Sequence, residues 1–150
     1  MAELMCEVLI NATPSTVFEL LTDPGLRQHW LGTDVELDPR PGGIYKALVA
    51  GTHPALGEFV EVSPDEKIVF TFGWDEPDHP IPAGSTLVAI TLSAEGPKTR
   101  VQLVHSGLPD DAIADHTMGW NHYLGRLTTI AEGGEVGPDQ EMSNPSSTEG

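Results

Sequence analysis

The sequence predicts an α+β fold in which one antiparallel sheet carries helices on one of its faces. Short runs with strand composition follow one another through residues 34–105, and several are separated only by a turn of a few residues. Connections this short can join only antiparallel strands. A single stripe of apolar residues at helical spacing then runs from Ile113 to Ala131 and predicts a helix over residues 110–131. We therefore expect a sheet of about six to seven strands and one long C-terminal helix.

The first elements are a strand and two short helices. Alternating apolar residues predict a strand over residues 4–11. Thr13 and Pro14 then match the usual start of a helix, which is an N-cap residue followed by proline at the first helical position. This helix ends at Pro24, and residues 26–31 are expected to form a second short helix.

Strands dominate the middle of the chain. Each is a short run enriched in β-branched and aromatic residues and bounded by turn residues. We expect strands over residues 34–37, 44–50, 58–62, 68–73, 86–93 and 99–105. The connection 75–84 is acidic and rich in proline, so it is expected to be a surface loop in which His79 is solvated.

The folded domain is expected to end with the last helix. Its apolar residues recur at intervals of three and four from Ile113 to Ala131, acidic residues occupy its expected first turn at 110–111, and a pair of glycines follows it. The segment beyond is acidic, lacks Lys and Arg, and cannot bury enough apolar surface to offset its ordering entropy. We therefore expect one domain over residues 1–132 and a flexible acidic tail over residues 133–150.

The composition excludes several classes of function. The chain has 23 Asp and Glu against seven Lys and Arg, which gives a formal net charge of −16. Sequence-independent binding of nucleic acid and docking on anionic lipid both need clustered basic residues, so neither is expected. No apolar run approaches the ~18 residues of a membrane span, and the N-terminal residues do not form a secretory signal. With Cys6 as its single cysteine, the protein is expected to be cytoplasmic.

Several short motifs occur in order along residues 4–131. They are Ala12-Thr13-Pro14, Leu31-Gly32 after Trp30, Arg40-Pro41-Gly42-Gly43, Gly57 to Val62 followed by Ser63-Pro64, Val69-Phe70-Thr71-Phe72, His105-Ser106-Gly107-Leu108 and Gly119-Trp120. With these motifs the chain resembles the START-like (SRPBCC) superfamily, and more narrowly the homologues of the C-terminal domain of the heat-shock-protein-90 ATPase activator. The resemblance implies a helix-grip fold, in which the sheet curls around the long helix and often leaves a cavity between them.

The parity of each predicted strand separates inward from outward side chains. Tyr45, Phe72 and His105 fall on inward faces, whereas the parity at Phe59 is ambiguous unless the strand contains a bulge. Large aromatic and imidazole side chains are therefore expected either to line a small-molecule cavity or to form an ordinary packed core. The candidate ligand-binding residues are Trp30, Tyr45, Phe59, Phe72, Trp74, His105, His116, Trp120 and Tyr123.

The histidines are the candidates for metal binding or catalysis. His116 and His122 are six positions apart and diverge around the predicted helix, and no metal-binding or nucleotide-binding motif occurs, so no metal and no cofactor are expected. His105 either acts as a general base, with Glu61 as its acidic partner, or bonds to neighbouring groups as a structural residue. The structural role is favoured, and no residue is assigned as catalytic.

These patterns favour a binding module over an enzyme. We expect it to hold a neutral, apolar or aromatic small molecule between the long helix and the sheet, because none of the seven basic residues is clearly placed there. Two alternatives stay open: a protein that interacts with a chaperone, as the family resemblance implies, and a cavity enzyme of the polyketide cyclase or hydrolase type. A monomer or a weak homodimer is expected.

Overall fold

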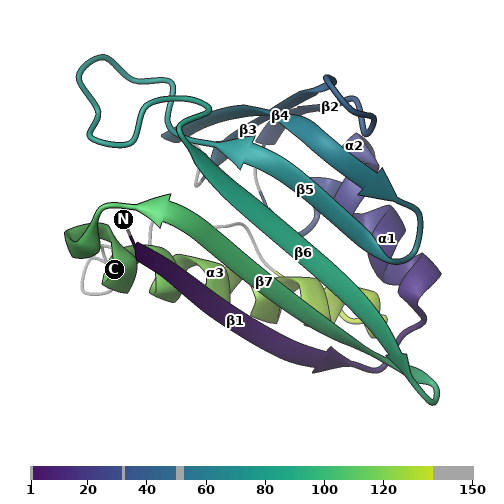
Figure 1. The fold of residues 1–150 in the computed structure, drawn as a ribbon. Helices are drawn as coiled ribbons and strands as arrows, with labels where there is room; N and C mark the ends of the chain where they lie inside the picture. The colour runs from purple at the N-terminus through teal and green to yellow at the C-terminus, as the bar shows by residue number, and fades with distance from the viewer. Residues whose placement is uncertain (1, 32, 50–52, 137–150) are drawn as a thin grey trace.

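An antiparallel sheet bends around the long C-terminal helix in the computed structural model (Figure 1). The structure describes residues 2–31, 33–49 and 53–136. In chain order the elements are β1 (Ala2–Ile10), α1 (Pro14–Thr22), α2 (Pro24–Arg27), β2 (Thr33–Leu37), β3 (Ile44–Val49), β4 (His53–Ser63), β5 (Lys67–Phe72), β6 (Thr86–Glu95), β7 (Lys98–Leu108), η1 (Asp110–Ala112) and α3 (Ile113–Ala131). The seven strands are ordered β1-β7-β6-β5-β4-β3-β2 in space. This arrangement confirms the predicted α+β fold class.

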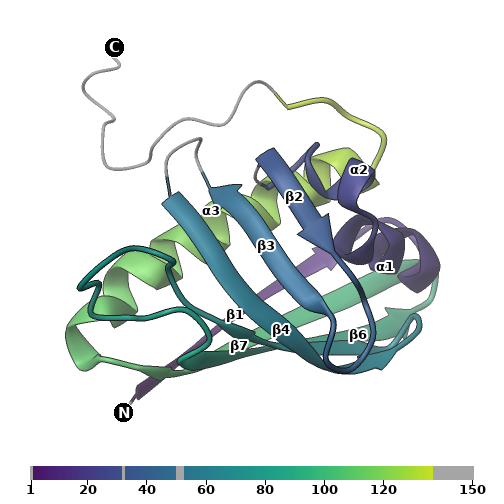
Figure 2. The same cartoon turned by 90° about the horizontal axis from the view of Figure 1, so that it is seen from above.

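The helices cover one face of the sheet (Figure 2). The backbone of α3 lies closest to β1 and also approaches α1, whereas it stays farther from β3, β4 and β5. Both views place α1 and α2 at the end of the sheet where α3 finishes, and the loop 75–84 at the end where α3 begins. Side chains therefore have to span the distance between α3 and the β3–β5 part of the sheet.

Asp23 determines where the two short helices meet. It ends α1, and one oxygen of its carboxylate accepts the backbone N–H groups of Gly25 at 2.9 Å and Leu26 at 3.1 Å. The second helix therefore spans Pro24–Arg27, and the predicted limits of 26–31 are wrong. The proline–glycine pair acts as the first turn of a capped helix here instead of a break between helices.

The strand β4 contains a bulge, and this bulge decides which of its side chains point inward. It is also longer than the predicted residues 58–62, because its first half pairs with the whole length of β3. The register between β4 and β5 shifts between Phe59 and Glu61. Phe59 therefore points inward and is buried, while Val60 is 50% exposed and Glu61 also faces solvent.

The inward faces of the other strands agree with the predicted parity. Tyr45 on β3, Phe72 on β5 and Val88 on β6 are buried in one hydrophobic core, and His105 on β7 is also fully buried. Val88 and His105 are direct partners in the register of β6 with β7. Strand alternation alone was thus sufficient to separate these residues from their outward neighbours.

The helix α3 begins three residues later than the predicted limit at residue 110, at the first residue of the apolar stripe. A single 3₁₀ turn at η1 comes first, so the α-helix starts at Ile113 and not at residue 110. Gly133 follows its end with a φ of +91°, a left-handed conformation that favours glycine. None of the described helices is long and apolar enough to cross a membrane. Residues 137–150 of the predicted tail lie outside the described residues.

Replacing Asp23 by alanine is expected to lower the free energy of unfolding by about 1 kcal/mol, because two N–H groups at the start of α2 lose their acceptor. Urea unfolding followed by circular dichroism measures this change. Asp23→Asn keeps an acceptor oxygen at the same position and serves as the matched control. An alanine variant as stable as the wild type would contradict the role of this cap.

Candidate functional site

Most of the candidate side chains meet between α3 and the β3–β5 part of the sheet. We name this region the aromatic interior; it is formed by Tyr45, Phe59, Phe70, Phe72, Trp74, His105, His116 and Trp120. Each ring contacts at least one other ring of the set, with centroids 4.0 to 6.3 Å apart. Phe70 is the member missing from the predicted set, although its inward parity is visible in the sequence.

Trp30 and Tyr123 are buried in the same hydrophobic core as the rings of Tyr45, Phe72 and Trp120. Trp30 is buried after α2, where its indole N–H donates to the carbonyl oxygen of Leu20 at 2.7 Å. The guanidinium of Arg126 on α3 donates to the carbonyl oxygen of Trp30 at 2.9 Å and thereby ties this turn to the helix. Tyr123 is buried on α3, with its ring centroid 4.8 Å from that of His122. Contact of any of these candidates with a ligand stays a prediction.

His105 is fully buried in the middle of a continuous chain of hydrogen bonds. The indole N–H of Trp120 donates to its Nδ1 at 3.0 Å, so Nδ1 carries no proton. The other nitrogen, Nε2, carries the proton and donates to Thr86 Oγ1 at 2.8 Å. Thr86 in turn donates to the carbonyl oxygen of Phe72 at 2.6 Å. These hydrogen bonds connect α3 to β7, β6 and β5, and they occupy both imidazole nitrogens of His105.

Burial keeps His105 neutral. Desolvation, with a smaller contribution from the neighbouring His116, lowers the pKa of His105 from 6.5 to about 3. A general base needs an available lone pair and a pKa near the working pH, and His105 offers neither. The geometry therefore supports the structural role of this histidine.

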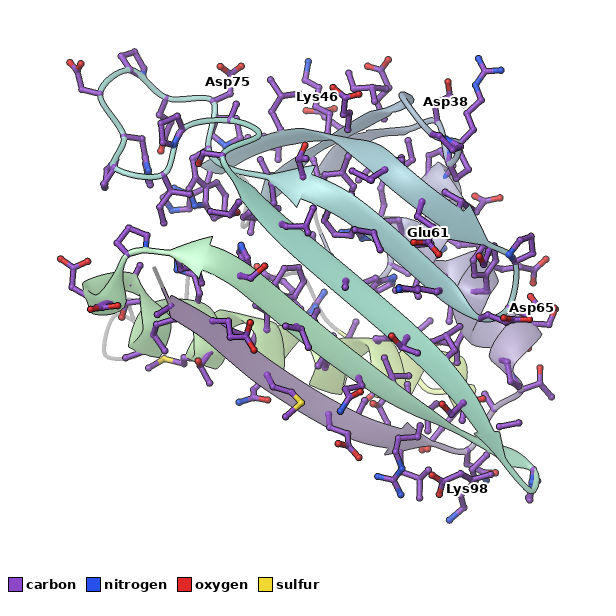
Figure 3. All side chains as sticks on the ribbon, in the orientation of Figure 1. Asp38, Lys46, Glu61, Asp65, Asp75 and Lys98 are labelled. Carbon is purple, nitrogen blue, oxygen red and sulfur yellow. The ribbon has the colours of Figure 1, made fainter. Side chains whose placement is uncertain are left out.

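Glu61 does not face His105, so the predicted acid–base pair is wrong. The bulge after Phe59 turns Glu61 outward, where its side chain is 50% exposed and lies 3.8 Å from Lys67 Nζ (Figure 3). Strand parity alone could not show this, because one inserted residue reverses the direction of every side chain that follows it.

Trp74, which precedes the loop 75–84, and His116 in the first turns of α3 contact each other and form a half-buried rim. Trp74 Nε1 donates to His116 Nε2 over 3.4 Å, and His116 Nδ1 donates to the carbonyl oxygen of Ala112 at 2.9 Å. The loop is not simply solvated, since the ring centroid of His79 lies 6.1 Å from that of Trp74. In the part of the chain that the structure describes, no group of three or more His, Cys, Asp or Glu is placed to hold a metal ion.

Arg27 belongs to the site but was missed by sequence reasoning. Its side chain is only 2% exposed, and its guanidinium carbon lies 4.8 Å from the Trp30 ring centroid and 5.0 Å from the Tyr45 ring centroid. The guanidinium donates to the Tyr45 hydroxyl and, at 3.5 Å, to the carbonyl oxygen of Leu21. The expectation that no basic residue enters the interior is therefore wrong. One signal was present, because Arg27 precedes Trp30 by three positions and arginine stacks on indole rings.

The curved sheet, the long helix across it and the aromatic interior define a domain of the helix-grip type. Residues 11–132 match the family model described as activator of Hsp90 ATPase homolog 1-like protein, and the chain belongs to this family. The match confirms the resemblance that the sequence motifs indicate. No curated protein matches the chain.

Several solved structures share the fold. The AHSA1-like protein from Rhizobium etli is 44% identical, with a TM-score of 0.73 over 92% of this chain and 86% of that one. The Aha1 dimer from Colwellia psychrerythraea is 20% identical, with a TM-score of 0.78 over 91% of this chain and 100% of that one. DynU16, a protein in the dynemicin biosynthetic locus, is 22% identical, with a TM-score of 0.78 over 93% of this chain and 49% of that one. The last two likenesses concern the fold alone.

The neutral burial of His105 predicts a specific dependence of stability on pH. Between pH 6.5 and about 3, the unfolded chain binds a proton at His105 that the folded protein excludes. Stability is therefore expected to fall as the pH drops through this window, with this residue contributing up to about 1.4 kcal/mol per pH unit. His105→Gln does not titrate and should make the dependence shallower in urea unfolding.

The matched control for this prediction is His29→Gln, because His29 is an exposed histidine of the same chain. This variant should keep the full dependence of the wild-type protein on pH. A dependence that is equally steep in the wild type and in His105→Gln would show that His105 is not held neutral by the fold.

Proposed function

We propose that this protein is a small-molecule binding module that holds an apolar or aromatic ligand in the aromatic interior. The observation that carries this proposal is the concentration of large rings between β3–β5 and a helix whose backbone stays away from these strands. Small-molecule sites are typically lined by such apolar and aromatic side chains, with a few polar groups that orient the ligand.

The rim supports a route into this interior. Trp74 is half-buried, and its hydrogen bond to His116 is long at 3.4 Å, which makes it weak. The ring of Trp74 covers that of Phe72, with 5.2 Å between their centroids. A change of rotamer at Trp74 breaks this hydrogen bond and the ring contacts with Phe72, His79 and His116, and it gives a ligand access to the rings beneath.

The geometry of the rings favours an aromatic ligand. Tyr45 and Phe70 are stacked with centroids 4.0 Å apart, while Phe72 meets Trp74 and His105 edge to face. Both arrangements are the preferred contacts of aromatic rings, so a ligand ring can replace or extend them at little cost.

Binding is favoured over catalysis by the state of the polar groups. His105 is neutral with both nitrogens bonded, and Glu61 lies on the outside of the sheet. Figure 3 shows that the labelled side chains of Lys46, Asp75 and Lys98 also project away from the molecule. The cyclase or hydrolase alternative therefore loses the pair of His105 and Glu61 on which it rested.

Freshly purified protein is expected to bind 1-naphthylmethanol, a neutral aromatic alcohol, with a saturable change in tryptophan fluorescence. The readout is specific, because the three tryptophans of the chain, Trp30, Trp74 and Trp120, all lie in or beside the aromatic interior. Thermal shift checks that binding stabilises the fold. Native mass spectrometry of the untreated protein tests for a small molecule that copurifies.

Two variants serve to localise the binding. Trp74→Ala removes a ring of the rim and is expected to weaken binding, whereas Met118→Ala changes a side chain that is 56% exposed on α3 and should have no effect. The proposal fails if no apolar probe binds saturably and the fresh protein carries no small molecule.

The family match favours a second candidate function, the binding of an Hsp90-type chaperone. The family model carries the description activator of Hsp90 ATPase homolog 1-like protein, and one protein of the same fold is named Aha1. Pull-down with the Hsp90 homologue of the same organism, with ATPase activity as the readout, tests this alternative. No binding at micromolar concentration would exclude it. Chaperone binding at the outer surface would leave the interior, and hence binding of 1-naphthylmethanol, unchanged.

A further inference from the structure

Arg27 carries a positive charge into the interior, and no acidic side chain of the described residues pairs with it. Only 2% of its surface is exposed, and none of the ion pairs among the described residues involves it. Burying a guanidinium without a carboxylate is costly, because the charge loses its hydration without gaining a counter-charge. Charged side chains are almost never fully buried unless they are paired, so this site lacks the anion that such a group normally meets.

Two hydrogen-bond donors at this point also have no acceptor among the described residues. Within the described part of the chain, Arg27 Nε is the buried side-chain nitrogen that has no partner. The Tyr45 hydroxyl accepts from Arg27 Nη2, and among the described residues no hydrogen bond is donated by this hydroxyl. Its own proton is therefore available to a second acceptor. A single ligand group with two acceptor oxygens can satisfy both Arg27 Nε and Tyr45.

The guanidinium is held in place beside the aromatic interior. The ring centroids of Trp30 and Tyr45 lie 4.8 Å and 5.0 Å from its central carbon, within the usual range of a cation–π contact. Tyr45 in turn stacks on Phe70 and contacts Phe72, so the charged end passes directly into the apolar rings. This juxtaposition suits a ligand with one anionic end and an apolar body.

We propose that Arg27 and Tyr45 bind the carboxylate of an apolar or aromatic acid whose body lies in the aromatic interior. This inference rests on the proposed binding function and names the class of its ligand. The carboxylate accepts from Arg27 Nε and from the Tyr45 hydroxyl, and it supplies the missing counter-charge. The net charge of −16 repels anions at a distance, but physiological salt screens such repulsion beyond about 8 Å, whereas the guanidinium acts at contact.

The test compares probes that differ only at their polar end. 1-Naphthoate and 1-naphthylmethanol share an aromatic body, and octanoate and octanol share an aliphatic one. Isothermal titration calorimetry of the full-length chain at neutral pH is expected to show that the carboxylate of the better-binding pair binds about tenfold more tightly than its alcohol.

Three variants assign the preference to the two donors. Arg27→Met removes the charge and keeps an unbranched side chain, so the preference should disappear while the alcohol still binds. Tyr45→Phe keeps the ring and removes one donor, which should weaken binding of the carboxylate by about fivefold. Arg40→Met is the matched control, since it removes the same charge from a side chain that is 77% exposed and should keep the full preference.

The outcomes separate this inference from the binding function on which it rests. Equal affinity for acid and alcohol, or a preference that survives in the variants at Arg27 and Tyr45, overturns the inference and leaves the binding function standing. Binding of neither pair of probes overturns both. Thermal unfolding verifies that each variant folds, and if Arg27→Met does not fold, Tyr45→Phe decides the question.

Discussion

The hydrogen bonds that run from Trp120 through His105 and Thr86 to the carbonyl of Phe72 hold the helix and the sheet together across the core. They link α3 to β7, β6 and β5, which are neighbours in the sheet. Each of the three donors in this series of hydrogen bonds meets an acceptor, and breaking any one bond would leave a buried polar group unpaired. The same links occupy both nitrogens of His105. This wall of the interior therefore positions the rings and is not arranged for proton transfer.

The opposite end of the interior depends on a local interaction. The carboxylate of Asp23 caps α2, and this short helix carries Arg27 into the space beside Tyr45. The interior thus has a neutral, fully hydrogen-bonded end at His105 and a positively charged end at Arg27, with Tyr45 and Phe72 between them. An ordinary apolar core has no need of a buried charge, and this polarity is what distinguishes the site.

Much of this structure could be predicted from local patterns. The Thr13 hydroxyl accepts the N–H of Thr16 as an N-cap does, and alternation along the strands placed Phe72 and His105 inward. The limits of the second helix could not be predicted, because Asp23 both ends one helix and starts the next. The direction of Glu61 could not be predicted either, since it depends on a bulge in the pairing of β4 with β5.

By itself the sequence determined the order of the elements, the fold class and most of the rings that face the core, because periods of two and of 3.6 residues are properties of neighbouring residues. Only the tertiary structure decided which groups bond to one another. His105 meets Thr86 and Trp120, and Arg27 meets Tyr45, across separations of 15 to 19 residues. Such contacts depend on how the sheet bends around the helix. Local periodicity carries no information about which residues this bend brings together.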